Sequence, residues 1–193
     1  MSLTVYTGPM FSGKSSYLIS RAQNASRVHK VLYVNHSFDN RNAHEVISVH
    51  NEFLNVKGDF DAISIFDLSE LSSEFLSKYT FLCIDEAQFF GNIVDNVKRF
   101  VEEYKLIVVV AGLNGTFERK PFTNSEFLEL LCIADDVVVM KDAWCEGCKK
   151  ERGLFTYKKT SDSSEILIGG ASDYMPLCRK CYTNVTCNKP TGF

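Results

Sequence analysis

The feature that most restricts the fold of this chain is an octapeptide close to its first residue. Residues 8–15 read G-P-M-F-S-G-K-S, which satisfies the pattern G-x-x-x-x-G-K-[ST], and they follow an apolar run at residues 3–6. Here the pattern predicts a phosphate-binding loop, because a tight turn without side chains at Gly8 and Gly13 lets backbone N–H groups reach phosphate oxygens. The alternative, a glycine turn with a surface lysine, is disfavoured by the strand-like run before it and the helical pattern after it. We predict that the chain binds a nucleoside triphosphate.

Two side chains of this loop add specific chemistry. Lys14 supplies a mobile positive charge for the outer phosphates, and Ser15 offers a hydroxyl to the Mg²⁺ that accompanies ATP. The helix that follows directs the positive end of its dipole at the same phosphates. The candidate ATP-binding residues of the loop are Gly8, Pro9, Met10, Phe11, Ser12, Gly13, Lys14 and Ser15.

Composition favours a compact intracellular enzyme over a nucleic-acid-binding or membrane protein. The 193 residues fit one ordinary domain plus a small appendage, and 45% hydrophobic residues are enough for a core. A net charge of -3 gives no electrostatic reason to bind a nucleic-acid polymer or an anionic membrane. No apolar stretch approaches the length that spans a bilayer, and the early phosphate loop would leave no room for a cleaved leader. We expect a cytosolic or nuclear protein and predict the cytoplasm.

Strand-like apolar runs alternate with helical stretches along most of the chain. Residues 106–111 are unbroken and rich in β-branched side chains, which predicts a strand at the sheet centre, buried on both faces. The alternation predicts an α/β fold, a parallel sheet with helices on both faces and ligands at the carboxyl ends of its strands. The predicted strands are residues 3–7, 31–35, 62–66, 81–84, 106–111 and 137–139, and the predicted helices are residues 14–27, 68–79 and 92–104.

Two segments depart from this alternation. Residues 35–60 are polar, rich in Asn and His and weakly periodic, which is typical of a functional or mobile loop. Around residues 141–144 the composition changes to Cys, Gly and charged residues. We therefore predict an ATP-binding α/β domain over residues 1–142 and a small zinc-binding domain with a short C-terminal tail over residues 143–193.

Two acidic residues, Asp85 and Glu86, end the apolar run at residues 81–84. An acidic residue at the end of a neighbouring strand is the usual partner of a phosphate loop, because its carboxylate must reach the Mg²⁺. We assign this role to Asp85, through water, since Mg²⁺ gives up its hydration shell reluctantly. A carboxylate that the metal does not need can accept the proton of an attacking hydroxyl, and we assign this role to Glu86. The alternative for Glu86 is a cap on the segment that follows.

Four of the seven cysteines form two C-x-x-C pairs, a pattern that suits tetrahedral thiolate zinc. Four thiolates leave no open coordination position, so this zinc would be structural, in a lobe too poor in apolar residues to fold alone. The alternative, two redox pairs, lacks a thioredoxin-like context. Cys83 and Cys132 lie in apolar runs, which predicts core positions, and Cys187 is interpreted as a thiol of the tail. The predicted zinc ligands are Cys145, Cys148, Cys178 and Cys181.

Taken together, these features resemble the type II thymidine kinases, a family of cellular and poxvirus-like enzymes. The resemblance runs in one collinear register from about Ser2 to Tyr182. It covers far more than a phosphate loop, which alone would not be specific. Its motifs are the phosphate loop, residues 85–90 (D-E-A-Q-F-F), residues 113–122 (L-N-G-T-F-E-R-K-P-F), the four cysteines, and residues 168–171 (I-G-G-A) with Tyr174.

The resemblance implies transfer of the γ-phosphoryl group of ATP to the 5′-hydroxyl of thymidine, which gives dTMP. It matches Glu86 to the family's catalytic base. It also matches Asp39 and Arg41 to an Asp-x-Arg segment, whose arginine would neutralise developing phosphate charge beside Lys14. Gln88 joins the candidate ATP-binding residues, and the family suggests a homotetramer.

The same resemblance implies a nucleoside pocket. Residues 156–174, between the cysteine pairs, look like the family's lasso, a lid whose backbone grips the pyrimidine edge. The zinc would then anchor both ends of this lid. The candidate thymidine-binding residues are Met10, Phe89, Leu113, Phe117, Phe122, Thr156, Glu165, Ile166, Leu167, Ile168, Gly169 and Tyr174.

Some positions depart from the family pattern, and two other functions compete with it. Asn114 stands where the family commonly has Asp, Ala87 where it commonly has Gly, and residues 42–59 match poorly. The motif D-E-A-Q also resembles that of a helicase, but a helicase needs a second motor domain and a basic track. A non-catalytic nucleotide-binding regulator is disfavoured by Glu86 and by the loop that would enclose the base.

Overall fold

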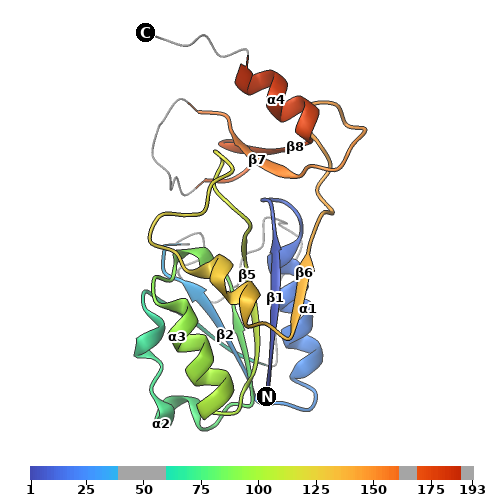
Figure 1. Ribbon diagram of the computed structural model, residues 1–193. Coiled ribbons are helices and arrows are strands. Elements are labelled where there is room, and N and C mark those ends of the chain that lie inside the picture. The colour runs from blue at the N-terminus through green and yellow to red at the C-terminus, as the bar shows by residue number, and fades with distance from the viewer. Residues whose placement is uncertain (39–59, 161–168, 188–193) are drawn as a thin grey trace.

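The structure is a computed structural model, and it describes residues 1–38, 60–160 and 169–187. The strands are β1 (Ser2–Gly8), β2 (Val31–His36), β3 (Asp61–Ile65), β4 (Phe81–Ile84), β5 (Ile107–Leu113), β6 (Asp136–Val139), β7 (Phe155–Lys158) and β8 (Tyr174–Leu177). Six of them form one sheet in the order β3-β2-β4-β5-β1-β6, in which every neighbouring pair is parallel (Figure 1). The predicted α/β fold with a parallel sheet is therefore confirmed.

The predicted central strand, β5, lies between β4 and β1 and is buried on both faces. Successive side chains of a strand point to opposite faces. Accordingly, Val108 and Val110 join the core on one face of the sheet, while Val109 and Ala111 join the core on the other. None of these four side chains is exposed, so an unbroken apolar run is the pattern that this position requires.

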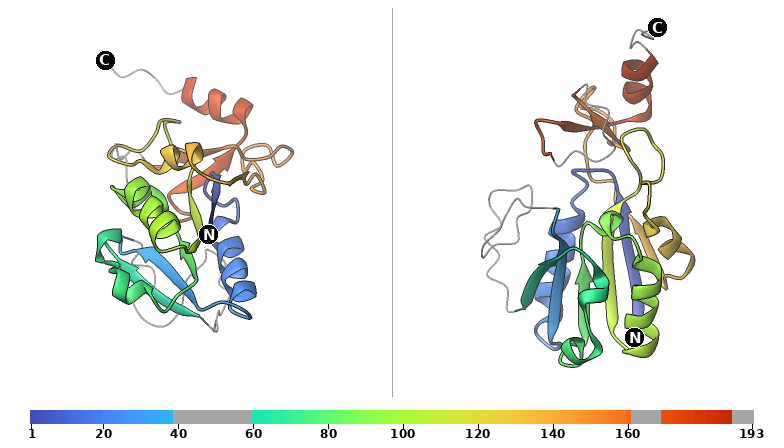
Figure 2. Two further views of the ribbon diagram at one scale, coloured as in Figure 1. Left: turned by 60° about the horizontal axis from the view of Figure 1, so that its bottom comes forward. Right: turned by 90° about the vertical axis from the view of Figure 1, so that its left-hand side faces the viewer.

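Helices cover both faces of the large sheet (Figure 2). The helices of the described residues are α1 (Lys14–Ala25), η2 (Leu68–Glu70), α2 (Ser73–Leu76), η3 (Ala87–Phe89), α3 (Ile93–Lys98), η4 (Arg99–Glu103), η5 (Phe127–Cys132) and α4 (Arg179–Cys187), of which α4 packs on β7 and β8 and not on the large sheet. α1 packs Leu18 and Ile19 into the core that contains Val109. α3 and η5 pack Val97 and Phe127 into the core that contains Val108.

The predicted helix at residues 68–79 is wrong in its extent, since the chain forms two short helices there. The Asp67 carboxylate accepts a hydrogen bond from the N–H of Ser69 and starts η2. The Ser72 hydroxyl then accepts from the N–H of Phe75 and starts α2, so two N-caps interrupt one apolar periodicity. The predicted helix at residues 92–104 is confirmed as α3, which continues as the π-helical turn η4.

A smaller lobe lies beyond the carboxyl ends of the large sheet, at the top of Figure 1. Its two strands, β7 and β8, are antiparallel, and α4 packs on them. Because the parallel strands all point toward this lobe, their carboxyl ends and the lobe face each other. Among the helices of the described residues, none has both the length and the apolar character needed to cross a bilayer.

Candidate active site

The phosphate loop joins β1 to α1 and adopts a conformation that needs its glycines. Gly13 has a φ of 83° and precedes the first residue of α1. At Gly8 an added Cβ would lie 2.4 Å from the carbonyl oxygen of Met140 and 2.9 Å from Ser12 Oγ. Larger residues at these two positions would therefore distort the turn.

Lys14 is buried although its side chain carries a charge. Its ammonium group donates hydrogen bonds to the carbonyl oxygens of Pro9, at 2.8 Å, and Gly8, at 3.2 Å. Burial lowers the pKa of Lys14 to about 8, and the carboxylates of Glu86 and Asp85 partly oppose this effect. The end of β4 therefore lies close enough to the phosphate loop for its two acids to interact with Lys14.

Asp85 is held by hydrogen bonds around its buried carboxylate. Oδ2 accepts from the Tyr33 hydroxyl at 2.6 Å, and Oδ1 accepts from the N–H of Glu86 at 2.9 Å. Burial raises the pKa of Asp85, and the Ser15 side chain lies close enough to this carboxylate to lower its pKa in part. Burial together with Asp85 raises the pKa of Tyr33, which keeps the phenol a donor. Ser15 and Asp85, the two residues assigned to Mg²⁺, thus lie together, and their oxygens suit a hard cation.

Glu86 adopts a backbone conformation that is uncommon for a residue with a side chain, with a φ of 50°. It is the N-cap residue of η3, but its side chain makes no capping hydrogen bond, so the capping alternative is not what the structure shows. Instead, Glu86 Oε2 accepts a 2.6 Å hydrogen bond from Gln88 Nε2. Gln88 Oε1 in turn accepts from the N–H of Leu113 at 2.9 Å. The carboxylate is therefore fixed to the carboxyl end of β5.

The described candidate nucleoside-binding residues come from segments at the carboxyl end of the large sheet and from the small lobe. Thr156, on β7, accepts a 3.0 Å hydrogen bond from the N–H of Met10, which joins the phosphate loop to the small lobe. The rings of Phe89 and Phe122 meet edge to face, with their centroids 6.2 Å apart. These contacts bring η3, the segment before η5 and β7 to the carboxyl end of the large sheet.

Phe117 and Tyr174 are both neighbours of Lys158. The Lys158 ammonium group lies 4.9 Å from the centroid of the Phe117 ring. Lys158 and Tyr174 are directly paired across β7 and β8, so their side chains share one face of this sheet. Lys158 and Tyr174 are both buried, with 3% and 6% of their surface exposed. The structure thus gathers two predicted pocket residues around a lysine that was not predicted.

The four predicted zinc ligands form one cluster. The first C-x-x-C pair precedes β7 and the second follows β8, and the antiparallel pairing of these strands brings the two pairs together. Their sulfur atoms all lie within 4.8 Å of one another, and all four cysteines are free of disulfides. Four thiolates at this spacing could hold a tetrahedral metal ion, and this donor set suits zinc.

Six predicted site residues lie outside the described residues: Asp39, Arg41, Glu165, Ile166, Leu167 and Ile168. Gly169 is described, and an added Cβ there would lie 2.5 Å from Asp173 Oδ2. Of the two predicted core cysteines, Cys83 is buried, but Cys132 is exposed at the end of η5. The prediction for Cys132 was wrong because this short helix buries Leu130 and turns its last residue outward.

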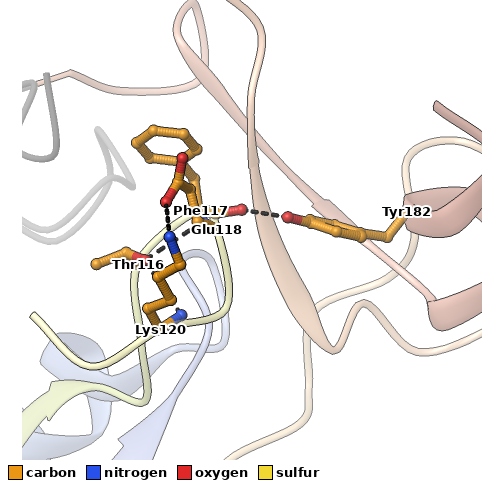
Figure 3. A network of polar contacts seen from close by, with 5 residues as sticks. All are labelled: Thr116, Phe117, Glu118, Lys120 and Tyr182. Carbon is orange, nitrogen blue, oxygen red and sulfur yellow. Dashed lines mark hydrogen bonds and ion pairs between the residues drawn. The ribbon is translucent and has the colours of Figure 1, made fainter. Parts of the chain in front are cut away.

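Sequence reasoning missed two tyrosines that contact predicted site residues. Tyr33 hydrogen-bonds Asp85, and the Tyr182 hydroxyl donates to the carbonyl oxygen of Phe117 (Figure 3). Tyr33 had no local signal, because it pairs with Cys83 across β2 and β4 and reaches Asp85 only through that register. Tyr182 had one weak signal, its place directly after Cys181.

The arrangement combines the parts that phosphoryl transfer needs. Backbone N–H groups and Lys14 can bind phosphates, Asp85 and Ser15 can hold a divalent cation, and Glu86 can accept a proton beside them. The aromatic side chains lie at the same end of the sheet and could enclose an acceptor.

Comparison with known proteins agrees with this arrangement. A family model described as thymidine kinase matches residues 1–182. A thymidine kinase of Mycoplasma mobile is 36% identical over 182 residues, which cover 93% of this chain and 86% of that protein. A thymidine kinase of vaccinia virus (strain Western Reserve) is 38% identical over 177 residues, 91% of this chain and 93% of that protein. Thymidine kinase a of Arabidopsis thaliana is 36% identical over 183 residues, 92% and 73% of the respective chains.

Proposed function

The chain belongs to the thymidine kinase family, and we propose that it transfers the γ-phosphoryl group of ATP to the 5′-hydroxyl of thymidine. The products are dTMP and ADP, which makes the reaction a salvage step in the synthesis of DNA precursors. The observation that carries this proposal is the position of Glu86 beside buried Lys14, at the end of the strand next to β5. This position offers a proton acceptor next to a phosphate-binding lysine.

In the proposed reaction, the 5′-oxygen of thymidine attacks the γ-phosphorus while the bond from that phosphorus to the β–γ bridging oxygen breaks. Glu86 accepts the proton of the 5′-hydroxyl. Lys14 and the N–H groups of residues 8–15 neutralise charge on the outer phosphates. Bound with ATP, Mg²⁺ would add positive charge at the β- and γ-phosphates, and Ser15 and Asp85 are the residues that would hold it.

For the nucleoside, we propose a pocket walled by side chains and closed by the lasso. Met10, Phe89, Phe122 and Phe117 would line it together with Leu113 and Thr156, and Tyr174 would cover it. The contacts between Met10 and Thr156 and between Phe89 and Phe122 support this grouping. Backbone recognition by residues 165–169 and charge neutralisation by Asp39 and Arg41 rest on the family resemblance.

We also propose that the cysteine cluster holds one structural zinc ion. The thiolates of Cys145, Cys148, Cys178 and Cys181 would fill all four positions, so the metal would take no part in the reaction. Its role would be to fold residues 143–193 as a second domain on the α/β domain of residues 1–142. The small apolar core around the cysteines supports this role, because it consists largely of the ligands themselves and of Leu177 and Tyr182.

The proposed assembly is a homotetramer in the cytoplasm. β6 is a terminal strand of the large sheet, and Val137, Val138 and Val139 are 43%, 40% and 49% exposed. An exposed apolar edge strand invites pairing with another chain. This feature supports self-association.

A coupled assay of ADP release by the purified protein, without DNA, tests the proposed function. ADP release that depends on thymidine, with dTMP identified as the product, is the expected result. Release that needs a nucleic-acid polymer would favour a helicase-like ATPase. ATP binding without any release would favour a regulatory protein.

A further inference from the structure

The turn that carries Phe117 is closed by hydrogen bonds among its own residues. The N–H of Thr116 donates to the carbonyl oxygen of Lys120 at 2.8 Å, and the N–H of Arg119 donates to that of Thr116 at 2.9 Å. Thr116 Oγ1 also accepts from the N–H groups of Glu118 and Lys120, each at 3.3 Å (Figure 3). We call residues 116–120 the Phe117 turn.

The small lobe holds this turn at the Phe117 carbonyl group. Tyr182 is the first residue after Cys181, and its ring is part of the core around the cysteines. Its hydroxyl donates a hydrogen bond to the carbonyl oxygen of Phe117, across the space between α4 and the turn (Figure 3). Only 4% of Tyr182 is exposed, so breaking this bond would leave a shielded polar group without a partner.

A side chain of the turn, Arg119, also contacts the ring of the same tyrosine. The Arg119 guanidinium lies 4.5 Å from the centroid of the Tyr182 ring and 5.5 Å from that of Phe155. These two rings are themselves 5.5 Å apart, so the cation covers an aromatic pair of the small lobe. Cation–π contacts of this kind are attractive and favour Arg over Lys.

We propose that Tyr182 and Arg119 are positioning residues for nucleoside binding. They hold the Phe117 turn against the cysteine-bearing lobe and thereby fix the Phe117 ring at the pocket. This inference rests on the proposed function, in which Phe117 walls the thymidine pocket. It adds a second link between the cysteine cluster and the nucleoside, from Cys181 through Tyr182 to Phe117, that does not involve the lasso.

Neither contact involves the phosphate loop, which meets the small lobe at a separate hydrogen bond from the N–H of Met10 to Thr156 Oγ1. Loss of the contacts at the Phe117 turn should therefore raise the KM for thymidine while kcat and the KM for ATP change little. A general weakening of the lobe would change all three quantities together.

The sharpest test is Tyr182→Phe, which removes one oxygen and keeps the ring. We expect the KM for thymidine to rise about three- to tenfold, the usual effect of one lost hydrogen bond, with the metal content unchanged. Arg119→Met removes the cation that the Phe117 turn places on the Tyr182 ring, and it should also raise the KM for thymidine. Both residues act on one turn. The double variant should therefore raise the KM for thymidine by less than the product of the two single increases.

Two controls accompany these variants. Lys120→Met removes a positive charge from the same turn, where the side chain forms an exposed ion pair with Glu118, and it should leave the KM for thymidine unchanged. Tyr104→Phe removes the same hydroxyl group from a tyrosine outside the small lobe, at the C-cap of η4. It should also leave the KM for thymidine unchanged.

The outcomes separate this inference from the proposed function. If the wild-type protein does not phosphorylate thymidine, the proposed function fails first. If it does, but Tyr182→Phe and Arg119→Met both leave the KM for thymidine within about twofold, the positioning role is overturned. An equal rise in the KM for ATP would overturn it as well. Should Tyr182→Phe lose its metal, Arg119→Met alone decides, because residue 119 lies outside the cysteine-bearing lobe.

Discussion

Gln88 holds the carboxylate of Glu86 in place, with a 2.6 Å hydrogen bond from its Nε2 to Oε2. Its amide oxygen, Oε1, accepts a hydrogen bond from the N–H of Leu113, and the Gln88 side chain is buried. A buried amide with both ends paired fixes a neighbouring group more firmly than an exposed one can. Sequence comparison with the family placed Gln88 among the ATP-binding residues, and its contacts here favour a role in orienting Glu86.

Replacing Gln88 by Met should lower kcat about ten- to a hundredfold, because the proposed base would lose the group that orients it. The KM values should change far less. The variant should also lose about 1–3 kcal/mol of unfolding free energy, since the N–H of Leu113 would be left unpaired. Steady-state kinetics and urea unfolding measure the two effects. An unchanged kcat in a folded variant would show that Glu86 does not depend on Gln88.

Glu86→Gln should lower kcat on the order of a hundredfold or more, the usual contribution of a general base. The amide keeps the size of the side chain, so ATP and thymidine should still bind. Calorimetric titration with each substrate, beside the ADP-release assay, separates binding from turnover.

Glu118→Gln is the matched control, because Glu118 is a carboxylate on an exposed turn whose side chain pairs with Lys120. It should retain nearly all activity. If Glu86→Gln also turned over at close to the wild-type rate, the assignment of the base would be wrong.

Metal analysis should find about one zinc per chain, bound without exchangeable water. Cys145→Ser or Cys178→Ser should lose zinc, solubility and thymidine binding together, because thiolate ligation and folding of the lobe are one equilibrium. Cys187→Ser is the control, since that exposed thiol lies outside the cluster. A disulfide between Cys145 and Cys148 in freshly purified, reduced protein would refute the zinc site.

The affinity for ATP should fall as the pH rises above about 8. Burial lowers the pKa of Lys14 to about 8 in the protein alone, so the side chain is mostly charged below this pH and mostly neutral above it. ATP binds the charged form, and binding at higher pH must therefore include uptake of a proton. The affinity should decrease by up to about tenfold for each pH unit above 8.

Lys14→Arg tests the cause, because arginine stays charged over the whole range. Whatever its absolute affinity, this variant should bind ATP with little dependence on pH between about 7 and 9. Equilibrium titration at several pH values measures both proteins. The same slope in wild type and variant would assign the pH dependence to another group.

Much of the fold could be predicted because a buried parallel sheet leaves a simple trace in the sequence. Each strand of the large sheet was predicted to within two residues, and the central place of β5 followed from its unbroken apolar run. The helix at residues 68–79 could not be predicted in full, since its apolar periodicity continues through the break at Leu71. Only the caps at Asp67 and Ser72 decide where the chain leaves the helix.

At the site, motifs predicted the groups that are close in sequence and missed those joined by the fold. The pairs of cysteines were found because each ligand lies near its partner in the chain. Tyr33 and Asp85 are 52 residues apart, and Tyr182 and Phe117 are 65 apart. Such contacts depend on strand register and on the docking of one lobe on the other. Motifs of a few neighbouring residues do not specify either.

The last prediction uses two variants to distinguish the residues that bind ATP from those that bind thymidine. Lys14→Ala removes the charge that faces the ATP phosphates and nothing from the nucleoside pocket. It should abolish phosphoryl transfer and leave the thymidine affinity largely intact. Tyr174→Ala should do the reverse and raise the KM for thymidine about ten- to a hundredfold, because a buried aromatic wall would be lost.

Met175→Ala is the matched control for Tyr174→Ala. The two residues are neighbours on β8, so their side chains point to opposite faces, and Met175 packs against the core around the cysteines. This variant should cost stability and spare the KM for thymidine. If Tyr174→Ala instead raised the KM for ATP and left the KM for thymidine unchanged, β8 would border the phosphate side of the site. The lid over the nucleoside would then have to be formed by another part of the chain.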